Sequence, residues 1–345
     1  MTDSNLPQIP NSRNNNSGTV GRDPQEELRF PPVRNGVDYL RSVVELLDGD
    51  PDPRDLKYAV LHLQAATEVL LKARLVAFDW RLVFAKVDEA DEDAYRRGDF
   101  NSCNMKDAIK RLRDQGIEIS PEDKGNITHL GQQRNRLQHY GLTDSVIAVE
   151  TRAAKALDFL LNFVHDHLVP RLGEAEARVV EREMDVLRPR FREIRSLVTE
   201  RSKRLPGALE AHLDYTVVCR TCGEWALVTR GDPACRSCHE TWEHPTDAAC
   251  WYMCDVLGVS FREAWDAIKT CPVCEIKAVV PGAFVASSRD TAITLCFTCA
   301  WRVGLMMCIE CGELVPQDGE GVRQREGWGM CNSCRECKEP EGNLR

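Results

Sequence analysis

Hydrophobic residues recur at helical spacing along two stretches in the first half of the chain. In the first stretch they lie at Leu56, Ala59, Val60, Leu63, Ala66 and Leu70. Leu61, Val69 and Leu71 lie between them, so this helix is apolar nearly all round, which is typical of a central, buried helix. The second stripe comprises Val146, Val149, Ala153, Leu157, Leu160, Val164 and Leu168. Together the two stretches predict a helical bundle over residues 33–170.

A further helix is predicted between these two. Ser120 is a good capping residue, and Pro121 suits the first helical position. Glu122 and Asp123 then place negative charge at the positive end of the helix dipole. The helix is expected to end near Gly141, because glycine commonly follows a helix C-terminus.

The segments that flank this bundle differ from it in composition. Residues 1–32 are rich in Asn, Ser, Gly and Pro, which predicts a disordered tail. Residues 171–205 alternate in charge and turn basic from Arg188 to Arg204, which predicts a charged connecting helix with solvated faces. After Pro206 the chain changes to short β-rich runs and glycine turns, interrupted by a helical linker at 246–268.

Cysteine is concentrated at the C-terminal end, where fifteen of the sixteen residues lie beyond position 218. Twelve of them form Cys-x-x-Cys pairs: Cys219/Cys222, Cys235/Cys238, Cys271/Cys274, Cys296/Cys299, Cys308/Cys311 and Cys331/Cys334. Zinc prefers four tetrahedral thiolate or imidazole ligands, and each pair supplies two. Taken two by two, the pairs enclose 12, 21 and 19 residues. The spacing predicts three structural zinc ions per chain, one in a ribbon at 206–245 and two in ribbons at 269–345.

Some cysteine assignments stay open at this stage. The last four pairs could also interleave as a cross-brace, and Cys337 could replace one of their ligands because it follows Cys334 at the same spacing. Cys250 and Cys254 share a helical face near two histidines, where buried small residues are favoured over a fourth metal site. Cys103 stands alone and has no assigned role. The predicted fold class is a mainly α N-terminal helical bundle with small C-terminal β-rich zinc-ribbon modules.

Charge and hydropathy limit the possible binding partners and the cellular location of the protein. The net charge is −9, and residues 206–345 hold 13 basic against 20 acidic side chains. This balance argues against a nonspecific duplex-binding surface, which works by neutralising phosphates with Lys and Arg. No stretch approaches the ~18 apolar residues of a membrane helix, and residues 1–29 lack the apolar core of a signal peptide. A cytoplasmic protein with no membrane partner is expected.

The best candidate for a chemical site lies on the helix that begins at Ser120. Its apolar stripe runs Ile127, Leu130, position 134 and Leu137, so Arg134 occupies a position where the pattern asks for a hydrophobic residue. Such an arginine needs an anionic partner, a ligand or a second subunit. Asn135 and His139, four residues apart, share another face of the helix.

These residues resemble a known motif. Arg134, the polar Asn135, three further residues and His139 are similar to the Arg-polar-x-x-x-His signature of the HEPN superfamily, an all-α family of nucleotide-binding domains. The likeness covers about residues 33–170. Glu68 and Lys72 are similar to a Glu and Lys often seen on the second HEPN helix, although an ordinary intrahelical ion pair explains them equally well.

The resemblance implies metal-independent cleavage of RNA by a homodimer in which two motif copies face each other. His139 would exchange protons, Arg134 would hold the scissile phosphate, and Asn135 would orient phosphate or His139. Arg136 and Tyr140 would have supporting roles. Toxins of one HEPN subtype carry a Tyr two residues after the His, whereas here Tyr140 is adjacent and position 141 is Gly.

Two functions follow from these expectations. The first is an endoribonuclease, a bacterial toxin or anti-phage effector whose zinc ribbons recognise RNA or a trigger. The alternative is a non-enzymatic dimeric protein that binds a protein or nucleic-acid partner through its ribbons. The motif favours the enzyme, and the acidic ribbon region favours a protein partner at that end.

Overall fold

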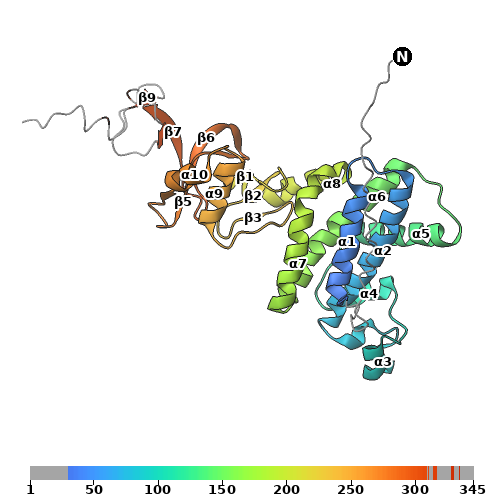
Figure 1. The fold of residues 1–345 in the computed structure, drawn as a ribbon. Coiled ribbons are helices and arrows are strands. Elements are labelled where there is room, and N and C mark those ends of the chain that lie inside the picture. The colour runs from blue at the N-terminus through green and yellow to red at the C-terminus, as the bar shows by residue number, and fades with distance from the viewer. Residues whose placement is uncertain (1–29, 309, 311–313, 317–327, 330–333, 335–345) are drawn as a thin grey trace, which may run out of the picture. The chain divides into compact units, whose positions relative to one another are not determined.

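The protein is described by a computed structural model that covers residues 30–308, 310, 314–316, 328–329 and 334 (Figure 1). The predicted tail, residues 1–32, therefore lies almost wholly outside the described residues. The helices and sheets all belong to a unit that begins at Pro32. Among the described helices, none combines the length and apolar composition needed to cross a bilayer.

Helices account for most of residues 32–209 (Figure 1). The α-helices there are α1 (Pro32–Leu47), α2 (Pro53–Val76), α3 (Glu92–Arg97), α4 (Met105–Asp114), α5 (Pro121–His139), α6 (Val146–Phe163), α7 (Glu174–Leu187) and α8 (Arg195–Leu209). Short helical turns join several of them: η1 (Trp80–Val83), η2 (Val87–Glu89), η3 (Val164–Leu168), η4 (Val169–Arg171), η5 (Arg188–Glu193) and η6 (Leu213–Tyr215).

Helix α2 is the centre of the bundle, as its nearly continuous apolar surface predicts. Asp52 and Asp55 form a reciprocal capping box at its N-terminus, and Pro53 occupies the first turn. Helices α1, α4, α5 and α6 all pack against it. Gly36 of α1 lies so close to α2 that an added Cβ would approach Leu70 Cδ2 to 2.3 Å, which explains why this position has no side chain.

Helix α5 begins as its sequence indicates. The Ser120 side chain accepts a hydrogen bond from the Asp123 backbone N–H, and Pro121 follows at the first position. The helix ends at His139, and Gly141 has a φ of +87°, a left-handed conformation that favours glycine. The predicted helix is thus confirmed with its stop two residues earlier.

Residues 171–205, expected to form a charged connecting helix with solvated faces, contain two helices instead. Helix α7 is followed by turn η5 and then by α8, because Pro189 lies just inside η5 and lacks the N–H needed to continue a helix. Both helices also bury an apolar stripe, with α7 packed on α1 and α8 on α6. The buried residues include Val180, Met184, Leu187, Phe191, Leu197 and Leu205. Most of the charged side chains therefore lie on the outer faces of packed helices, but Arg188 and Arg201 are buried.

Two sheets follow the bundle, and all their strand pairs except one are antiparallel. The first has the order β1–β2–β3, with strands β1 (Thr216–Val218), β2 (Trp225–Val228) and β3 (Ala234–Cys235). Helices α9 (Pro245–Asp255) and α10 (Phe261–Ala267) come next. The second sheet has the order β4–β5–β6–β7–β8, with β9 parallel to β7. Its strands are β4 (Lys269–Thr270), β5 (Lys277–Val285), β6 (Ser288–Cys296), β7 (Arg302–Cys308), β8 (Leu314–Pro316) and β9 (Trp328–Gly329).

The described residues share one main hydrophobic core. It extends without interruption from Val33 in α1 to Phe297 after β6, and it includes the four cysteines of the first sheet. A second, smaller cluster is formed by Cys271, Val279 and Cys296. The fold class predicted from the sequence, a helical N-terminal part followed by small antiparallel modules with four-cysteine clusters, is confirmed.

Candidate metal centres and the polar end of helix α5

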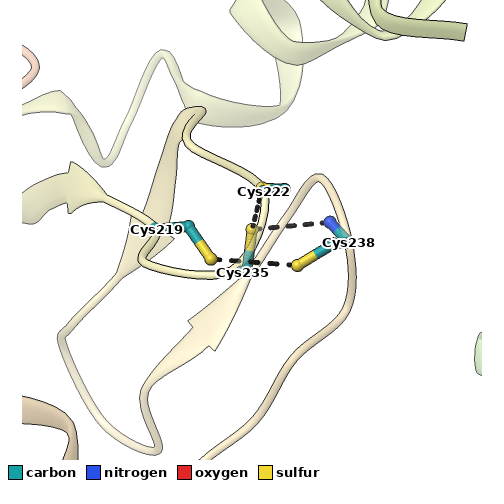
Figure 2. A group of neighbouring side chains, drawn as sticks. All are labelled: Cys219, Cys222, Cys235 and Cys238. Carbon is teal, nitrogen blue, oxygen red and sulfur yellow. Dashed lines mark hydrogen bonds between the residues drawn. The ribbon is translucent and has the colours of Figure 1, made fainter. Parts of the chain in front are cut away.

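The first four-cysteine group lies in the three-stranded sheet (Figure 2). Cys219 and Cys222 come from the turn after β1, and Cys235 and Cys238 from the turn that begins at β3. All four side chains are buried, and their Sγ atoms lie within 4.8 Å of one another. The closest pairs are Cys222–Cys235 at 3.7 Å and Cys219–Cys238 at 3.8 Å. Four thiols that converge in this way suit a single tetrahedral zinc ion.

The second group has the same arrangement in the larger sheet. It comprises Cys271, Cys274, Cys296 and Cys299, with Sγ–Sγ distances of 3.6 Å for Cys271–Cys299 and 3.7 Å for Cys274–Cys296. Burial opposes ionisation of Cys271, but the backbone N–H groups of Cys274 and Val273 lower the pKa of its thiol to about 7. Backbone N–H groups directed at sulfur favour the thiolate that zinc requires.

The four turns that hold these cysteines share one backbone geometry. In each, the first cysteine accepts a hydrogen bond through its C=O from the N–H four residues on, and donates its N–H to the C=O five residues on. The residue four positions after the first cysteine has a positive φ in every turn: Gly223, His239, Glu275 and Ala300. Within the described residues, the last three are the only non-glycine residues in this conformation. A positive φ is strained for a non-glycine residue, and such strain usually persists only where it serves a function. Here the turn directs two sulfur atoms at one point.

Both groups therefore fit a closed structural zinc site. Four cysteine ligands leave no open position for water or substrate, unlike a catalytic zinc site. Within the described part of the chain, only these two groups bring three or more candidate ligand atoms that close together. The predicted third site depends on Cys308, Cys311, Cys331 and Cys334, and with Cys337 it falls largely outside the described residues.

The remaining cysteines have the character of buried small residues. Cys250 is buried in α9, and burial raises the pKa of its thiol to about 11, with a further contribution from Cys254. Cys103 is buried, and burial likewise raises the pKa of its thiol. High thiol pKa values disfavour a thiolate nucleophile, and among the described residues neither cysteine belongs to a group of three or more converging ligand atoms.

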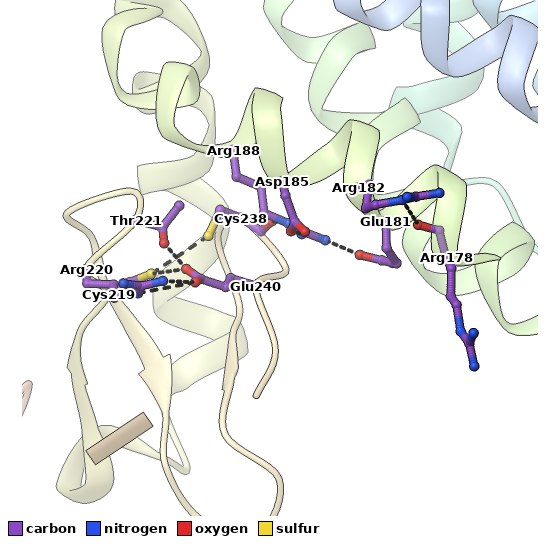
Figure 3. Close-up of polar contacts among 10 residues, drawn as sticks. All are labelled: Arg178, Glu181, Arg182, Asp185, Arg188, Cys219, Arg220, Thr221, Cys238 and Glu240. Carbon is purple, nitrogen blue, oxygen red and sulfur yellow. Dashed lines mark hydrogen bonds and ion pairs between the residues drawn. The ribbon is translucent and has the colours of Figure 1, made fainter. Parts of the chain in front are cut away.

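The first zinc group is tied to the helical bundle by Arg188 of η5 (Figure 3). Arg188 is 4% exposed, and its Nε donates a hydrogen bond of 3.0 Å to the Cys238 carbonyl. Its guanidinium also pairs with Glu181 of α7 at 2.6 Å and with Asp185. Burial opposes this charge, but the hydrogen bond from Arg188 to Glu181 and the two carboxylates raise the pKa of Arg188 above its usual value.

Two further contacts complete this junction. His239, in the second cysteine turn, lies with its Nε2 2.8 Å from Asn162 Oδ1 of α6. Its ring stacks on His165 at 4.3 Å between centroids, and burial, followed by the charge of neighbouring cationic groups, lowers the pKa of His239 to about 2. Glu240 lies beside the cysteines, where it accepts hydrogen bonds from Thr221 and from Cys219 Sγ (Figure 3).

The predicted motif residues lie at the C-terminal end of α5. Asn135, His139 and Tyr140 are exposed, and Arg134 is partly exposed, with its Nη1 donating a 3.0 Å hydrogen bond to Asn135 Oδ1. The prediction that Arg134 lies on the apolar stripe of the helix is wrong. Gln133, not Arg134, follows Ile127 and Leu130 on the buried face of the helix.

Two of the supporting residues, Glu68 and Lys72, lie on another helix. On α2, Lys72 Nζ donates to Glu68 Oε1 at 2.6 Å and to Ser102 Oγ at 2.8 Å. The first contact is an ordinary ion pair within a helix, and the second joins that helix to a neighbouring loop. Arg136 is exposed on α5. The described contacts thus bring Arg134 and Asn135 together, and place Glu68 and Lys72 with each other.

Comparisons of the chain with protein-family models, curated proteins and solved structures found no match. The resemblance to the HEPN superfamily consequently depends on the residues of α5 and on their helical setting.

Proposed function

We propose that the protein is a metal-independent endoribonuclease whose active site forms from the C-terminal ends of two α5 helices. The observation that supports this most directly is that His139 is exposed at the same helix end as the hydrogen-bonded Arg134–Asn135 pair. An exposed imidazole, a guanidinium and a carboxamide are the groups that proton transfer and phosphate binding require.

The residues would divide the chemistry between them. The ribose 2′-oxygen attacks phosphorus as it loses its proton to a base, and the bond from phosphorus to the 5′-oxygen breaks as an acid gives that oxygen a proton. His139 is the base or the acid in these two proton transfers, since imidazole accepts and donates protons near neutral pH. Arg134 stabilises the charge on the phosphate oxygens, and the Asn135 carboxamide orients Arg134 through the hydrogen bond between them. The products are a 2′,3′-cyclic phosphate and a 5′-hydroxyl.

Exposed apolar side chains beside the motif support a dimer. Tyr140 is 91% exposed, and Val146 and Ile147 at the start of α6 are 47% and 75% exposed. These residues flank the motif in the sequence, and exposed large apolar residues that adjoin one another are typical of an interaction surface. A two-fold interface here would bring the two copies of His139 to one site, because the same patch faces itself across the axis.

The test is cleavage of a labelled RNA by the purified protein in EDTA, with end-group analysis of the products. His139→Ala and Arg134→Ala are each expected to reduce the rate by ~10²-fold or more. Gln138→Ala is the matched control, because Gln138 is an exposed neighbour of His139 on the same helix end. A 2′-deoxy substitution at the scissile nucleotide should abolish cleavage.

Three results would refute this function. They are cleavage that requires Mg²⁺, cleavage at full rate by His139→Ala, and a monomer across micromolar concentrations in light scattering. Circular dichroism of each variant shows whether a lower rate reflects unfolding.

One observation favours the alternative, a non-enzymatic protein that binds a partner at its C-terminal end. Trp251, Phe261 and Trp265 are 39%, 57% and 42% exposed, and adjacent rings lie 6.1 and 6.4 Å apart. Exposed aromatic residues are enriched at protein interfaces. On this alternative no variant cleaves RNA, and Phe261→Ala weakens binding of the partner.

A further inference from the structure

A polar hollow lies between α5 and the start of α6, on the surface that leads to His139. Its volume is about 170 Å³. Pockets for drug-sized ligands are larger, about 300–1,000 Å³, so this one suits a single small group. The lining residues are His129, Gln132, Gln133, Arg136, Asp144 and Arg152.

Cationic and hydrogen-bond-donating groups predominate in the hollow. Asp144 is the one carboxylate among its lining residues, and Arg152 Nη1 donates to Asp144 Oδ2 at 2.7 Å. That hydrogen bond lowers the pKa of Asp144, which keeps the carboxylate ionised and fixes the position of Arg152. An arginine has five N–H donors, so Arg152 retains free donors beyond this pair.

Arg136 adds a positive charge to the hollow that is not paired with a carboxylate of the described residues. Its guanidinium makes no hydrogen bond or ion pair with any residue that the structure describes. An arginine fork with free donors beside a second arginine matches the oxygens of a phosphate, which arginine binds with two parallel hydrogen bonds.

Gln133 provides a second sign that the hollow is incomplete. It is 5% exposed, and its Nε2 is 3.4 Å from Asp144 Oδ2, which fixes the orientation of the amide. The buried Oε1 has no hydrogen-bond partner among the residues described. Such an orphaned acceptor is costly, and a hydrogen-bond donor on a bound ligand would satisfy it.

The hollow is continuous with the motif along the helix. His129, Gln132, Arg136 and His139 are spaced by three, four and three residues, so they form one stripe on the surface of α5. The stripe spans about 15 Å from His129 to His139, given a rise of about 1.5 Å per residue. A strand whose scissile phosphate lies at His139 would therefore pass over the hollow.

From these observations we infer that the hollow is a phosphate subsite for single-stranded RNA, in which Arg136 and Arg152 bind a backbone phosphate next to the scissile one. This inference rests on the proposed function for the identity of the ligand. The subsite adds affinity and positions the strand, and it takes no part in proton transfer.

The experiment measures binding of a short single-stranded RNA, methylated at every 2′-oxygen so that it cannot be cleaved, to the full zinc-loaded chain by fluorescence anisotropy. The logarithm of the binding constant is followed against the logarithm of salt concentration. Each phosphate contact to a single strand contributes a slope of about −0.7. Arg136→Gln is therefore expected to make the slope less negative by about 0.7, and Arg152→Gln to do the same.

Arg96→Gln is the matched control. It removes the same charge from a side chain on α3 that is 69% exposed. It should leave the slope unchanged. Cleavage of unmodified RNA by the wild type is measured in parallel. If the wild type cleaves but both hollow variants keep the wild-type slope, the subsite is refuted and the function stands. If the slopes change and the wild type does not cleave, the function is refuted and the subsite stands. No binding of the methylated RNA by the wild type refutes the subsite.

Discussion

Replacement of Arg188 by methionine tests whether the three-stranded sheet with the first four-cysteine group folds as one unit with the helical bundle. Methionine retains the apolar stem of the side chain and removes the guanidinium, so the change removes polar interactions while largely preserving packing. Without the guanidinium, the Cys238 carbonyl has no donor at this position, and Glu181 and Asp185 have no cation between them.

The magnitude follows from the burial of each partner. A hydrogen bond from a charged donor contributes about 1.5–3 kcal/mol when it is buried, as this bond is. The two carboxylates are 36% and 63% exposed, so water can solvate them, and each pair contributes about 0–1 kcal/mol. Arg188→Met should therefore lower the free energy of unfolding by about 1.5–5 kcal/mol.

The assay combines urea unfolding, followed by far-UV circular dichroism, with release of zinc to a chromogenic chelator. Arg190→Met is the matched control, because Arg190 is 38% exposed and pairs with Asp48 and Glu45 at the surface. It should cost about 0–1 kcal/mol. In Arg188→Met, zinc release and unfolding of the helices should both move to lower urea. The reasoning is refuted if the two variants are destabilised equally, or if zinc release is unaffected.

Three further outcomes are expected. Cys235→Ser and Cys296→Ser should each remove one zinc ion per chain in elemental analysis, and only Cys235→Ser should also weaken the helices towards urea; unchanged zinc content would contradict the four-cysteine sites. Gln133→Leu should raise the free energy of unfolding by about 1 kcal/mol, since it removes an orphaned buried carbonyl, and should weaken RNA binding; a less stable protein would show that Oε1 has a partner. Burial lowers the pKa of His165 below 6.5, so the unfolded chain binds more protons as the pH falls. Stability should therefore decline as the pH falls through 6.5, the ordinary pKa of histidine, and His165→Gln should flatten that decline in urea midpoints; an equal decline in both proteins would contradict it.

The sequence was most informative where one local rule decides the structure. The cap at Ser120 and the all-round apolar surface of α2 each depend on neighbours along the helix, and the structure has both. The Cys-x-x-Cys pairs of the first two groups are equally local, because each turn positions its two sulfurs by its own backbone hydrogen bonds.

The junction between bundle and zinc module could not be predicted in the same way. Arg188 lies in a run of charges, and nothing in that run distinguishes the one guanidinium that meets Cys238 from its solvated neighbours. Its hydrogen bond joins residues 50 positions apart, so only the tertiary fold identifies it. A weak signal was present in Pro189, which ends α7 and thereby fixes where the turn and its arginine must lie.

The difference between local rules and tertiary packing also explains why Gln133, and not Arg134, is buried on α5. The apolar period of the helix assigned position 134 to the buried face, but a helix has about 3.6 residues per turn, and a drift of one residue is enough to bury Gln133 instead. Which of two adjacent polar residues faces the core depends on the packing of α2 and α6 around α5.

The insertion of a cysteine turn into the helical bundle sets a limit on how this chain can be divided. A shortened protein that ended near Pro206, where the composition changes, would leave Asn162 and His165 without the ring and amide contacts of His239. It would also leave the Arg188 guanidinium without its carbonyl partner. The smallest piece that folds independently should therefore retain the first four-cysteine group, so we expect the stability of the helical part to depend on zinc as well.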